Sequence, residues 1–233
     1  MAADRAVGRG WLLTLEGPEG AGKTTQAERL WRRAASLGID VVLTREPGGT
    51  AVGERVRELL LDPGSTHGPR ADALLFNAAR AELVDEVLRP ALGRGALVVS
   101  TRFADSTLAY QGYGAGLPLG DLLALQRFAT AGLVPDLTIL LDLPAEAGLA
   151  RKDAERTRFE SAFGIDFHRR VREGFRALAA ADPERFAIVD ATRSEGAVEQ
   201  AVARAAGRLH GLGALPSASA RSDPELTAER IHR

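Results

Sequence analysis

Residues 11–25 read WLLTLEGPEGAGKTT, and this stretch indicates the fold of the whole chain. Its first six residues form an apolar run that is typical of a buried β-strand, and the run ends at Gly17. Helical spacing then begins at Lys23 and continues to about Ser36. A strand, a glycine-rich loop and a helix in direct succession are typical of a unit that binds phosphate at the start of its helix.

The same alternation of strand and helix continues along the rest of the chain. Apolar runs predict further strands at Ile39–Thr44, Ala96–Ser100, Leu137–Asp142 and Phe186–Asp190. Helical spacing predicts a short helix through Val56 and Leu60, and longer ones at Ala71–Leu92, Ala104–Gln111, Leu119–Thr130, Phe167–Ala181 and Ser194–Leu209. Because the strands are apolar from end to end, both faces of their sheet should be covered. The sequence therefore predicts a doubly wound α/β fold with about five parallel strands and ligands at their carboxyl ends.

The composition is that of one globular domain. The 233 residues are 45% hydrophobic and 26% charged with a formal net charge of −1, which indicates no nucleic-acid or membrane partner. The chain has no cysteine, no apolar signal-peptide core and no run long enough to cross a bilayer, as expected of a cytoplasmic protein. We expect residues 1–10 to be a flexible arm, 11–212 one domain, and 213–233 a disordered tail.

The loop after the first strand matches the pattern G-x-x-x-x-G-K-[ST] over residues 17–24. Its glycines allow backbone N–H groups to approach phosphate oxygens, and the helix start adds a positive dipole end. Lys23 should reach the β- and γ-phosphates of a nucleotide, and the Thr24 hydroxyl should bind Mg²⁺. The predicted ATP-binding residues are Gly17, Pro18, Glu19, Gly20, Ala21, Gly22, Lys23, Thr24 and Thr25. The motif alone does not distinguish a kinase from a motor or a switch.

Three arginines could form a cradle for a phosphorylated acceptor opposite this loop. Arg45 and Arg102 follow the second and third strands, and Arg80 lies on the helix between them. Arginine binds phosphate through two donors and keeps its charge. The alternative is that each arginine pairs with a nearby acid. Phe76 likewise could belong to the core or stack on a base.

Five segments together resemble the bacterial thymidylate kinases. They read EGPEGAGKTT, TREPGGT, LLFNAAR, STRFADSTLAYQG and PDLTILLDLP, and the resemblance extends from about residue 11 to 209. It implies transfer of the γ-phosphoryl group of ATP to dTMP, which gives dTDP for dTTP biosynthesis. It also implies Mg²⁺ as cofactor and a homodimer, with the helix at Ala71–Leu92 as a candidate interface.

The resemblance implies roles for individual residues on the acceptor side. Arg102 would hold the monophosphate of dTMP, Phe76 would stack on thymine, and Arg80 would contact the thymine carbonyl. Tyr110 would lie under the sugar and disfavour a 2′-hydroxyl.

Further roles follow from the same resemblance. Thr107 and Gln111 would make polar contacts around the base, Arg45 would shape the acceptor site, and Glu19 would lie near the sugar and phosphate of the acceptor.

Residues 151–160 read RKDAERTRFE and are dense in charge. Such a run is either a solvated helix end or a lid, here at about 150–161, that closes over ATP. Similar kinases place arginines in this lid, which makes Arg156 and Arg158 stronger candidates than Arg151. The predicted catalytic residues are Lys23, Arg102, Glu19, Arg156 and Arg158.

The chain departs from the family pattern at two positions. Thr157 replaces an aspartate of the lid, and Thr101 replaces the aspartate that precedes Arg102 in the family. That aspartate lies near the metal, where threonine offers a hydroxyl but no negative charge. We therefore expect an active enzyme that is less efficient than relatives with aspartate.

Two other functions are compatible with the phosphate-binding loop. One is a kinase for another acceptor, such as dUMP or a deoxynucleoside, which should lack the combination of Phe76, Arg80 and Tyr110. The other is a nucleotide-binding switch, which has no need of acceptor-side motifs. None of the four histidines has a partner pattern, and phosphoryl transfer to a phosphate oxygen requires no strong general base.

Overall fold

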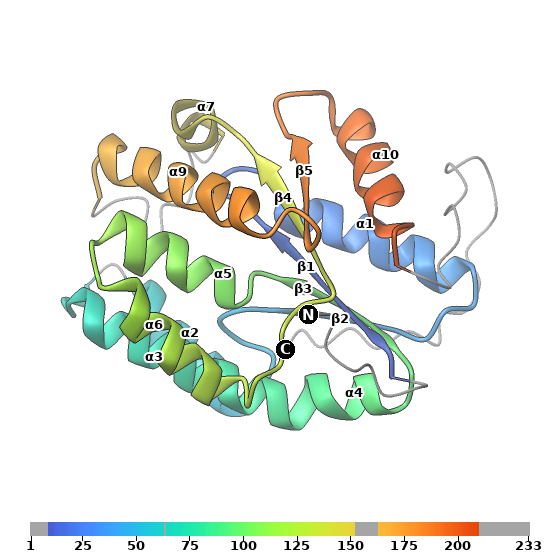
Figure 1. The fold of residues 1–233 in the computed structure, drawn as a ribbon, viewed down its shortest axis with the longest axis horizontal. Helices are drawn as coiled ribbons and strands as arrows, with labels where there is room; N and C mark the ends of the chain where they lie inside the picture. Colours follow the sequence, from blue (N-terminus) through green and yellow to red (C-terminus); the bar gives the residue numbers. More distant parts are fainter. Residues whose placement is uncertain (1–8, 63, 152–162, 210–233) are drawn as a thin grey trace.

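The computed structural model describes residues 9–62, 64–151 and 163–209. The predicted N-terminal arm, the C-terminal tail and the lid lie wholly or mostly outside these residues. Within them, strands alternate with helices from the first strand to the last helix (Figure 1).

The centre of the molecule is a five-stranded parallel sheet, as the sequence predicts. Its strands are β1 (Trp11–Glu16), β2 (Val41–Arg45), β3 (Leu97–Thr101), β4 (Leu137–Asp142) and β5 (Phe186–Asp190). They lie in the order β2-β3-β1-β4-β5, so β1 pairs with both β3 and β4. The loops after β1, β2 and β3 consequently leave the sheet at neighbouring positions of one edge.

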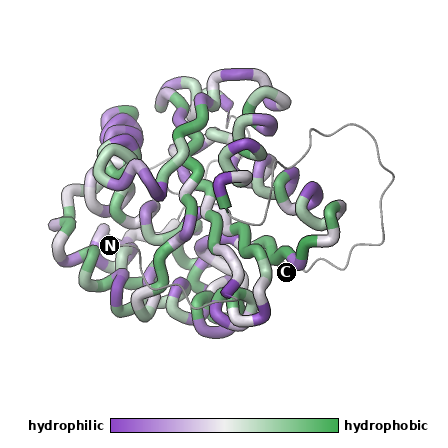
Figure 2. The backbone as a smooth tube through the Cα atoms, turned by 45° about the vertical axis from the view of Figure 1, so that its right-hand side comes forward, coloured by the Kyte–Doolittle hydropathy of each residue, from purple (hydrophilic) through white to green (hydrophobic). Residues whose placement is uncertain are grey.

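Helices cover both faces of the sheet (Figure 1). Their bounds are α1 (Lys23–Ser36), α2 (Ala51–Leu61), α3 (Pro69–Leu83), α4 (Arg89–Gly93), α5 (Ala104–Thr107), α6 (Leu119–Ala129), α7 (Ala145–Ala150), α9 (Ile165–Ala181) and α10 (Glu195–Ala206). Leu13 and Leu15 of β1 pack in the core that includes α1 and α10, whereas Leu12 packs on the opposite face. This alternation explains the continuous apolar strands, and Figure 2 shows them as the hydrophobic interior.

Two helices include a π-helical turn that the sequence does not reveal. The helix predicted at Ala71–Leu92 consists of α3, the π-helical turn η1 (Val84–Leu88) and α4, and Pro90 in α4 has no N–H to donate. The helix predicted at Ala104–Gln111 continues beyond α5 as the π-helix η2 (Leu108–Gly114). Residues 108–114 therefore follow a wider helical path than the sequence predicts.

A partly buried ion pair fixes α5 against the sheet. Arg185, which directly precedes β5, donates to Asp105 over 2.7 and 3.0 Å and to the Thr138 hydroxyl of β4 over 2.8 Å. Thr138 in turn bonds to Thr14 of β1 over 2.9 Å. The start of α5, which leads into the segment after β3, is thus tied to β1 and β4.

One prediction about histidine is wrong. His67 Nδ1 lies 2.5 Å from the carboxylate of Asp72 at the start of α3, so this histidine does have an acidic partner. The pair joins residues that are near in sequence, and neither residue lines the cavity described below. In the described part of the chain, no helix is long and apolar enough to cross a membrane.

Candidate active site

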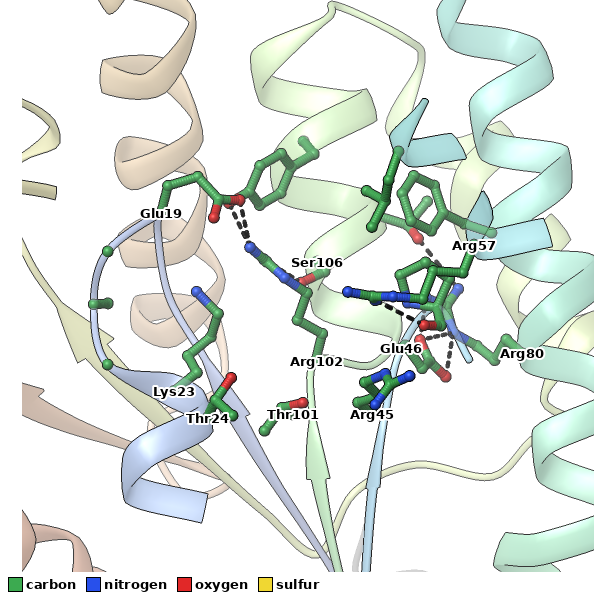
Figure 3. A pocket seen from close by; sticks show the side chains of 18 of the residues that line it. Glu19, Lys23, Thr24, Arg45, Glu46, Arg57, Arg80, Thr101, Arg102 and Ser106 are labelled. Carbon is green, nitrogen blue, oxygen red and sulfur yellow. Dashed lines mark hydrogen bonds and ion pairs between the residues drawn. The ribbon is translucent and has the colours of Figure 1, made fainter. Parts of the chain in front are cut away.

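The carboxyl ends of β1, β2 and β3 open onto one cavity of about 410 Å³ (Figure 3). The loop after β1 and the start of α1 form one wall, through residues 19–25. The opposite wall comes from the loop after β2, from α2 and from α3, and the segment after β3 lies between the two. The cavity therefore has two distinct sides, and the segment after β3 lies between them.

The loop after β1 has the backbone of an anion-binding site. Gly17, Gly20 and Gly22 have φ angles of 144°, 69° and 86°, which residues with a Cβ rarely adopt. Gly22 caps α1 without a side-chain hydrogen bond, and the first turn of α1 holds no acidic residue. The first N–H groups of a helix have no partner within it, so they are oriented to bind an anion in this loop.

Lys23 bends back over the same loop. Its Nζ donates to the carbonyl oxygens of Gly17 and Pro18 over 2.9 and 2.7 Å. Gly17 and Pro18 are predicted to bind ATP but do not line the cavity themselves. They hold the ammonium group of Lys23 beside it. Thr24 and Thr25 follow on the exposed side of the helix start and line the cavity.

Glu19 points away from the loop towards the segment after β3 (Figure 3). Its Oε1 accepts hydrogen bonds from Arg102 Nη2 over 2.5 Å and from the Tyr110 hydroxyl over 2.8 Å. Arg102 Nη2 also donates to Tyr110 over 3.0 Å, and its guanidinium lies 4.8 Å from the centre of the Tyr110 ring. Glu19 therefore contacts two of the residues predicted for the acceptor side.

Burial and neighbouring charges together shift the pKa values of Arg102 and Tyr110. Burial alone would lower the pKa of the Arg102 guanidinium, but Tyr110, Glu19 and Glu16 outweigh it and raise that pKa. Burial also raises the pKa of the Tyr110 hydroxyl well above its usual value, against the effect of Arg102. The arginine is therefore a permanent cation and the tyrosine a neutral hydrogen-bonding group.

Arg80 is the most completely buried cation of the site, with 1% of its surface exposed. Its Nε and Nη2 donate to Glu46 over 2.9 and 2.7 Å, and its Nη1 donates to Asn77 and Thr107 over 3.0 and 3.2 Å. The guanidinium thus joins α3 to the loop after β2 and to α5. It lines the cavity as part of a fixed network rather than as a mobile side chain.

Two further arginines line the side of the cavity that α2 and the loop after β2 provide. Arg45 donates to Glu54 over 3.0 Å, so it is paired with an acid and still borders the cavity. Arg57 donates to the carbonyl oxygen of Pro47 over 3.0 Å. Burial, followed by the charge of Arg45, lowers the pKa of Arg57. An anion in this part of the cavity would relieve the repulsion between the two arginines.

An apolar surface completes this side. Phe76 packs against the cluster that contains Tyr110 and Phe167, as a core residue would, and it also lines the cavity. The Tyr110 ring is held edge-on by Phe167 and Phe175, at centroid distances of 6.3 and 6.1 Å. Thr107 and Gln111 are buried side chains that place polar groups next to these rings.

Of the predicted lid residues, Arg156 and Arg158 lie outside the described residues. Arg151 lines the cavity and donates to the carbonyl oxygens of Gly20 and Ala191 over 3.4 and 3.2 Å. The first arginine of the charged segment therefore already contacts the phosphate-binding loop.

The oxygen donors at the start of α1 fit a metal ion that arrives with phosphate. Among the residues that the structure describes, no group of three or more His, Cys, Asp or Glu side chains could hold a metal by itself. Thr24 and Thr101 both line the cavity and offer hydroxyl oxygens. Mg²⁺ keeps several waters and takes oxygens from substrate phosphates, so it requires few protein ligands.

Comparison with known proteins identifies the family. The thymidylate kinase family model matches residues 15–202. The chain is 52% identical over 195 residues to the thymidylate kinase of Deinococcus radiodurans, a match that covers 83% of this chain and 94% of the relative. The chain belongs to the thymidylate kinase family. It is also 52% identical over 195 residues to the enzyme of Thermomicrobium roseum, with 82% and 92% covered.

A solved structure agrees with this family. The crystal structure of thymidylate kinase from Ehrlichia chaffeensis is 33% identical, with a TM-score of 0.66, and the match covers 78% of this chain and 93% of that one. The resemblance predicted from the five sequence segments is confirmed.

Sequence reasoning missed five residues that line the cavity of this thymidylate kinase, the polar Glu46, Arg57 and Ser106 and the apolar Pro47 and Leu61. Glu46 is part of the TREPGGT segment, so the motif contained a signal for it. Ser106 opens the STLAYQG part of the segment STRFADSTLAYQG, so that motif also contained a signal. Arg57 lies outside the five segments, and only the packing of α2 brings it to the cavity.

The close contact between Gly20 and α7 yields a test of the phosphate-binding loop. A Cβ at Gly20 would lie 2.1 Å from the backbone oxygen of Gly148, at a φ of 69°. Gly20→Ala should therefore displace the loop and weaken ATP binding by about ten-fold or more, which is about 1.4 kcal/mol or more. Isothermal titration calorimetry with ATP measures this change.

Gly196→Ala is the matched control for this substitution. Gly196 lies in α10, and a Cβ there would meet nothing within 4 Å. This variant should bind ATP like the wild type and gain about 0.5 to 1 kcal/mol of stability from better helix propensity. Equal ATP affinity of the two variants would show that the loop tolerates the added methyl group.

Proposed function

We propose that the chain transfers the γ-phosphoryl group of ATP to the 5′-phosphate of dTMP, and so produces ADP and dTDP. The observation that carries this proposal is the direct contact between Glu19 of the phosphate-binding loop and Arg102 with Tyr110 of the segment after β3. A site for a nucleotide triphosphate and an arginine suited to a second phosphate thereby face the same cavity.

Positioning and charge account for the chemistry of this transfer. A phosphate oxygen of dTMP is largely deprotonated near neutral pH, because its second pKa is about 6, and it can attack without a general base. Lys23 would exchange its carbonyl partners, Gly17 and Pro18, for the β- and γ-phosphates of ATP. Arg102 would hold the acceptor phosphate in line with that group and balance the charge between the two nucleotides.

The apolar wall is suited to a pyrimidine base. We propose that Phe76 stacks on thymine, and that Thr107, Gln111 and the network around Arg80 provide polar contacts to its edge. Tyr110, held between two phenylalanines, leaves little freedom beneath the sugar, which favours a 2′-deoxyribose. Arg45, which borders the same cavity, would shape the acceptor site.

The proposed cofactor is Mg²⁺, held by the Thr24 hydroxyl together with oxygens of the nucleotide. When bound, the ion neutralises negative charge on the β- and γ-phosphates. We further propose that residues 150–161 form a lid within the single domain of residues 11–212, and that Arg156 and Arg158 add positive charge at the transferred group. The cytoplasm is the proposed location, since ATP and dTMP are metabolites of that compartment.

The choice of acceptor tests this function directly. ADP release should be measured with ATP and Mg²⁺ while the monophosphate is varied. We expect dTMP to stimulate release well above dUMP, CMP or AMP, because the base wall fits thymine. Arg102→Met should lower kcat/KM for dTMP by about 100-fold, since it removes charge that stabilises the transferred group.

The other outcomes of this experiment assign the other functions. A stronger response to another monophosphate would indicate a kinase with a different acceptor. Binding of ATP without stimulation by any acceptor would indicate a nucleotide-binding switch and contradict the proposal.

Thr101 provides a second test, of metal handling. Thr101→Asp should raise turnover in saturating Mg²⁺, because it adds negative charge at the strand end that lines the cavity beside Thr24. Thr101→Asn is the matched control, since its side chain has the same size as aspartate without the charge. Turnover should be measured across a Mg²⁺ titration, and a lower turnover of the aspartate variant would contradict this expectation.

We propose that two chains pair through the outer surface of α3 and α6. Helices α3 and α6 pack together, and Leu74, Leu123 and Phe128 on them are 59%, 53% and 86% exposed. Large apolar side chains that stay exposed on two helices packed together would suit an interface. This surface overlaps the helix at 71–92 that the sequence singles out as a candidate interface.

Sedimentation analysis tests the pairing. The wild type should have the mass of two chains, and the double variant Leu74→Glu, Leu123→Glu the mass of one, because burying two carboxylates is costly. Ile188→Glu is the matched control, since Ile188 is 59% exposed on the edge strand β5. A wild type with the mass of one chain, or a double variant that still pairs, would contradict this interface.

A further inference from the structure

Glu16, the last residue of β1, carries a buried carboxylate that the chemistry described above does not use. Its side chain is 0% exposed. Its Oε1 accepts the backbone N–H of Phe103 over 2.7 Å, and its Oε2 accepts the hydroxyl of Ser106 over 2.6 Å. Both donors are neutral, and a buried carboxylate without a directly bonded cation is costly. Its position therefore needs an explanation beyond packing.

The two hydrogen bonds of this carboxylate hold the turn that carries Arg102. Arg102 has a φ of 72°, in the left-handed region that residues with a Cβ rarely adopt. Its N–H donates to the Leu15 oxygen over 3.0 Å, and its own oxygen accepts the Ser100 hydroxyl over 2.8 Å. Further along the chain, Phe103 and Ser106 bond to the Glu16 carboxylate. Leu15 and Glu16 of β1 and Ser100 of β3 thus hold the strained turn in place.

The hydrogen bonds form a relay with a definite direction. Arg102 Nη1 donates to the Ser106 hydroxyl oxygen over 3.1 Å, and that hydroxyl donates in turn to Glu16. One edge of the guanidinium is held in this way. The other edge, Nη2, contacts Glu19 and Tyr110 at the cavity. The relay therefore fixes Nη1, and Nη2 is the edge where a ligand in the cavity would displace Glu19 or Tyr110.

We propose that Glu16 is a positioning residue for the acceptor phosphate, which it serves by fixing Arg102 through Ser106 and the Phe103 N–H. This inference rests on the proposed function, in which Arg102 binds the phosphate of dTMP. The phosphate takes the Nη2 edge, while the Nη1 edge and the left-handed backbone stay fixed by the relay. Preorganisation of this kind lowers the cost of ordering the arginine when the acceptor binds.

The ionised form of Glu16 is the form that fits the relay, because both of its oxygens accept hydrogen bonds. Burial first, and then the charge of Asp105 on α5, raise the pKa of Glu16 to about 7, against the opposing effects of Ser106, Arg102 and Phe103. Asp105 is itself paired with Arg185. The carboxylate thus gains and loses its charge in the range where such an enzyme works.

The same shift determines how Glu16 affects stability. The folded state raises its pKa from 4.5 to about 7, so the folded protein favours the protonated acid. The stability that this group contributes is therefore complete below pH 4.5 and is lost as the pH rises through about 7. A glutamine at this position cannot ionise and escapes that loss. Positioning and stability consequently make opposite demands on this residue above neutral pH.

Glu16→Gln separates these two effects at pH 8. We expect the KM and the calorimetric Kd for dTMP to rise by about ten-fold, the loss that one charge-assisted hydrogen bond represents, with a smaller change in kcat. The melting temperature should rise at the same pH. A merely structural role predicts the reverse pattern, with lower stability and unchanged dTMP binding.

The pH profile supplies an independent signature. The ratio of the KM values of Glu16→Gln and the wild type should fall towards one as the pH drops through about 7, because the wild-type carboxylate then becomes protonated. The second ionisation of dTMP affects both proteins equally and cancels in the ratio. A ratio independent of pH would overturn the proposal.

Two further variants keep the test decisive. Ser106→Ala interrupts the relay but retains the Phe103 hydrogen bond, and it should also raise the KM for dTMP. Asp136→Asn is the matched control, since Asp136 accepts the N–H of Leu12 over 2.8 Å at the opposite end of β1. It should lower the melting temperature and leave the KM for dTMP unchanged.

The outcomes distinguish this inference from the proposed function. A wild type that phosphorylates no monophosphate contradicts the function itself. A wild type active on dTMP, with an unchanged KM in both Glu16→Gln and Ser106→Ala, contradicts the positioning role alone. If Glu16→Gln does not fold, the KM of Ser106→Ala decides the question by itself.

Discussion

A fixed positive charge, the Arg102 guanidinium, has to stay at the carboxyl edge of the sheet whether or not a phosphate is bound. Its environment follows from this constraint. Glu19 and Tyr110 accept hydrogen bonds from its cavity edge, and Ser106 accepts one from the other edge. The backbone adopts a left-handed turn at this residue so that the guanidinium reaches the cavity directly from the end of β3. Without these contacts a buried cation would destabilise the fold.

The same principle of paired charge applies across the acceptor side. Arg80 is paired with Glu46, Arg45 with Glu54, and Arg185 with Asp105. Arg80 and Arg45 line the cavity, whereas Arg185 and Asp105 do not line it and fix α5. The cavity is therefore held in shape by ion pairs that belong to the protein. Under the proposed function, the phosphates would displace only the contacts that face the cavity.

Much of this arrangement could be predicted from residues that lie close together in sequence. The five strands and their parallel arrangement follow from apolar runs, and the structure confirms them. The glycine spacing predicts the loop after β1, in which three glycines have positive φ angles. The family follows from five short segments. The two π-helical turns were missed, because the spacing of apolar residues does not show whether one turn of a helix contains an extra residue. The partner of His67 was missed because Asp72 belongs to the next helix.

The sequence by itself determined the backbone of the phosphate-binding loop, because a loop that bends through three glycines with positive φ angles and starts a helix is a local structure. It also determined which side chains carry charge next to the strand ends. The tertiary structure alone decided which of those charges meet. Glu19 and Arg102 are 83 residues apart in the chain, and Glu16 and Ser106 are 90 apart. These pairs form only because β1 and β3 are neighbours in the sheet, an order that pairing between distant segments establishes.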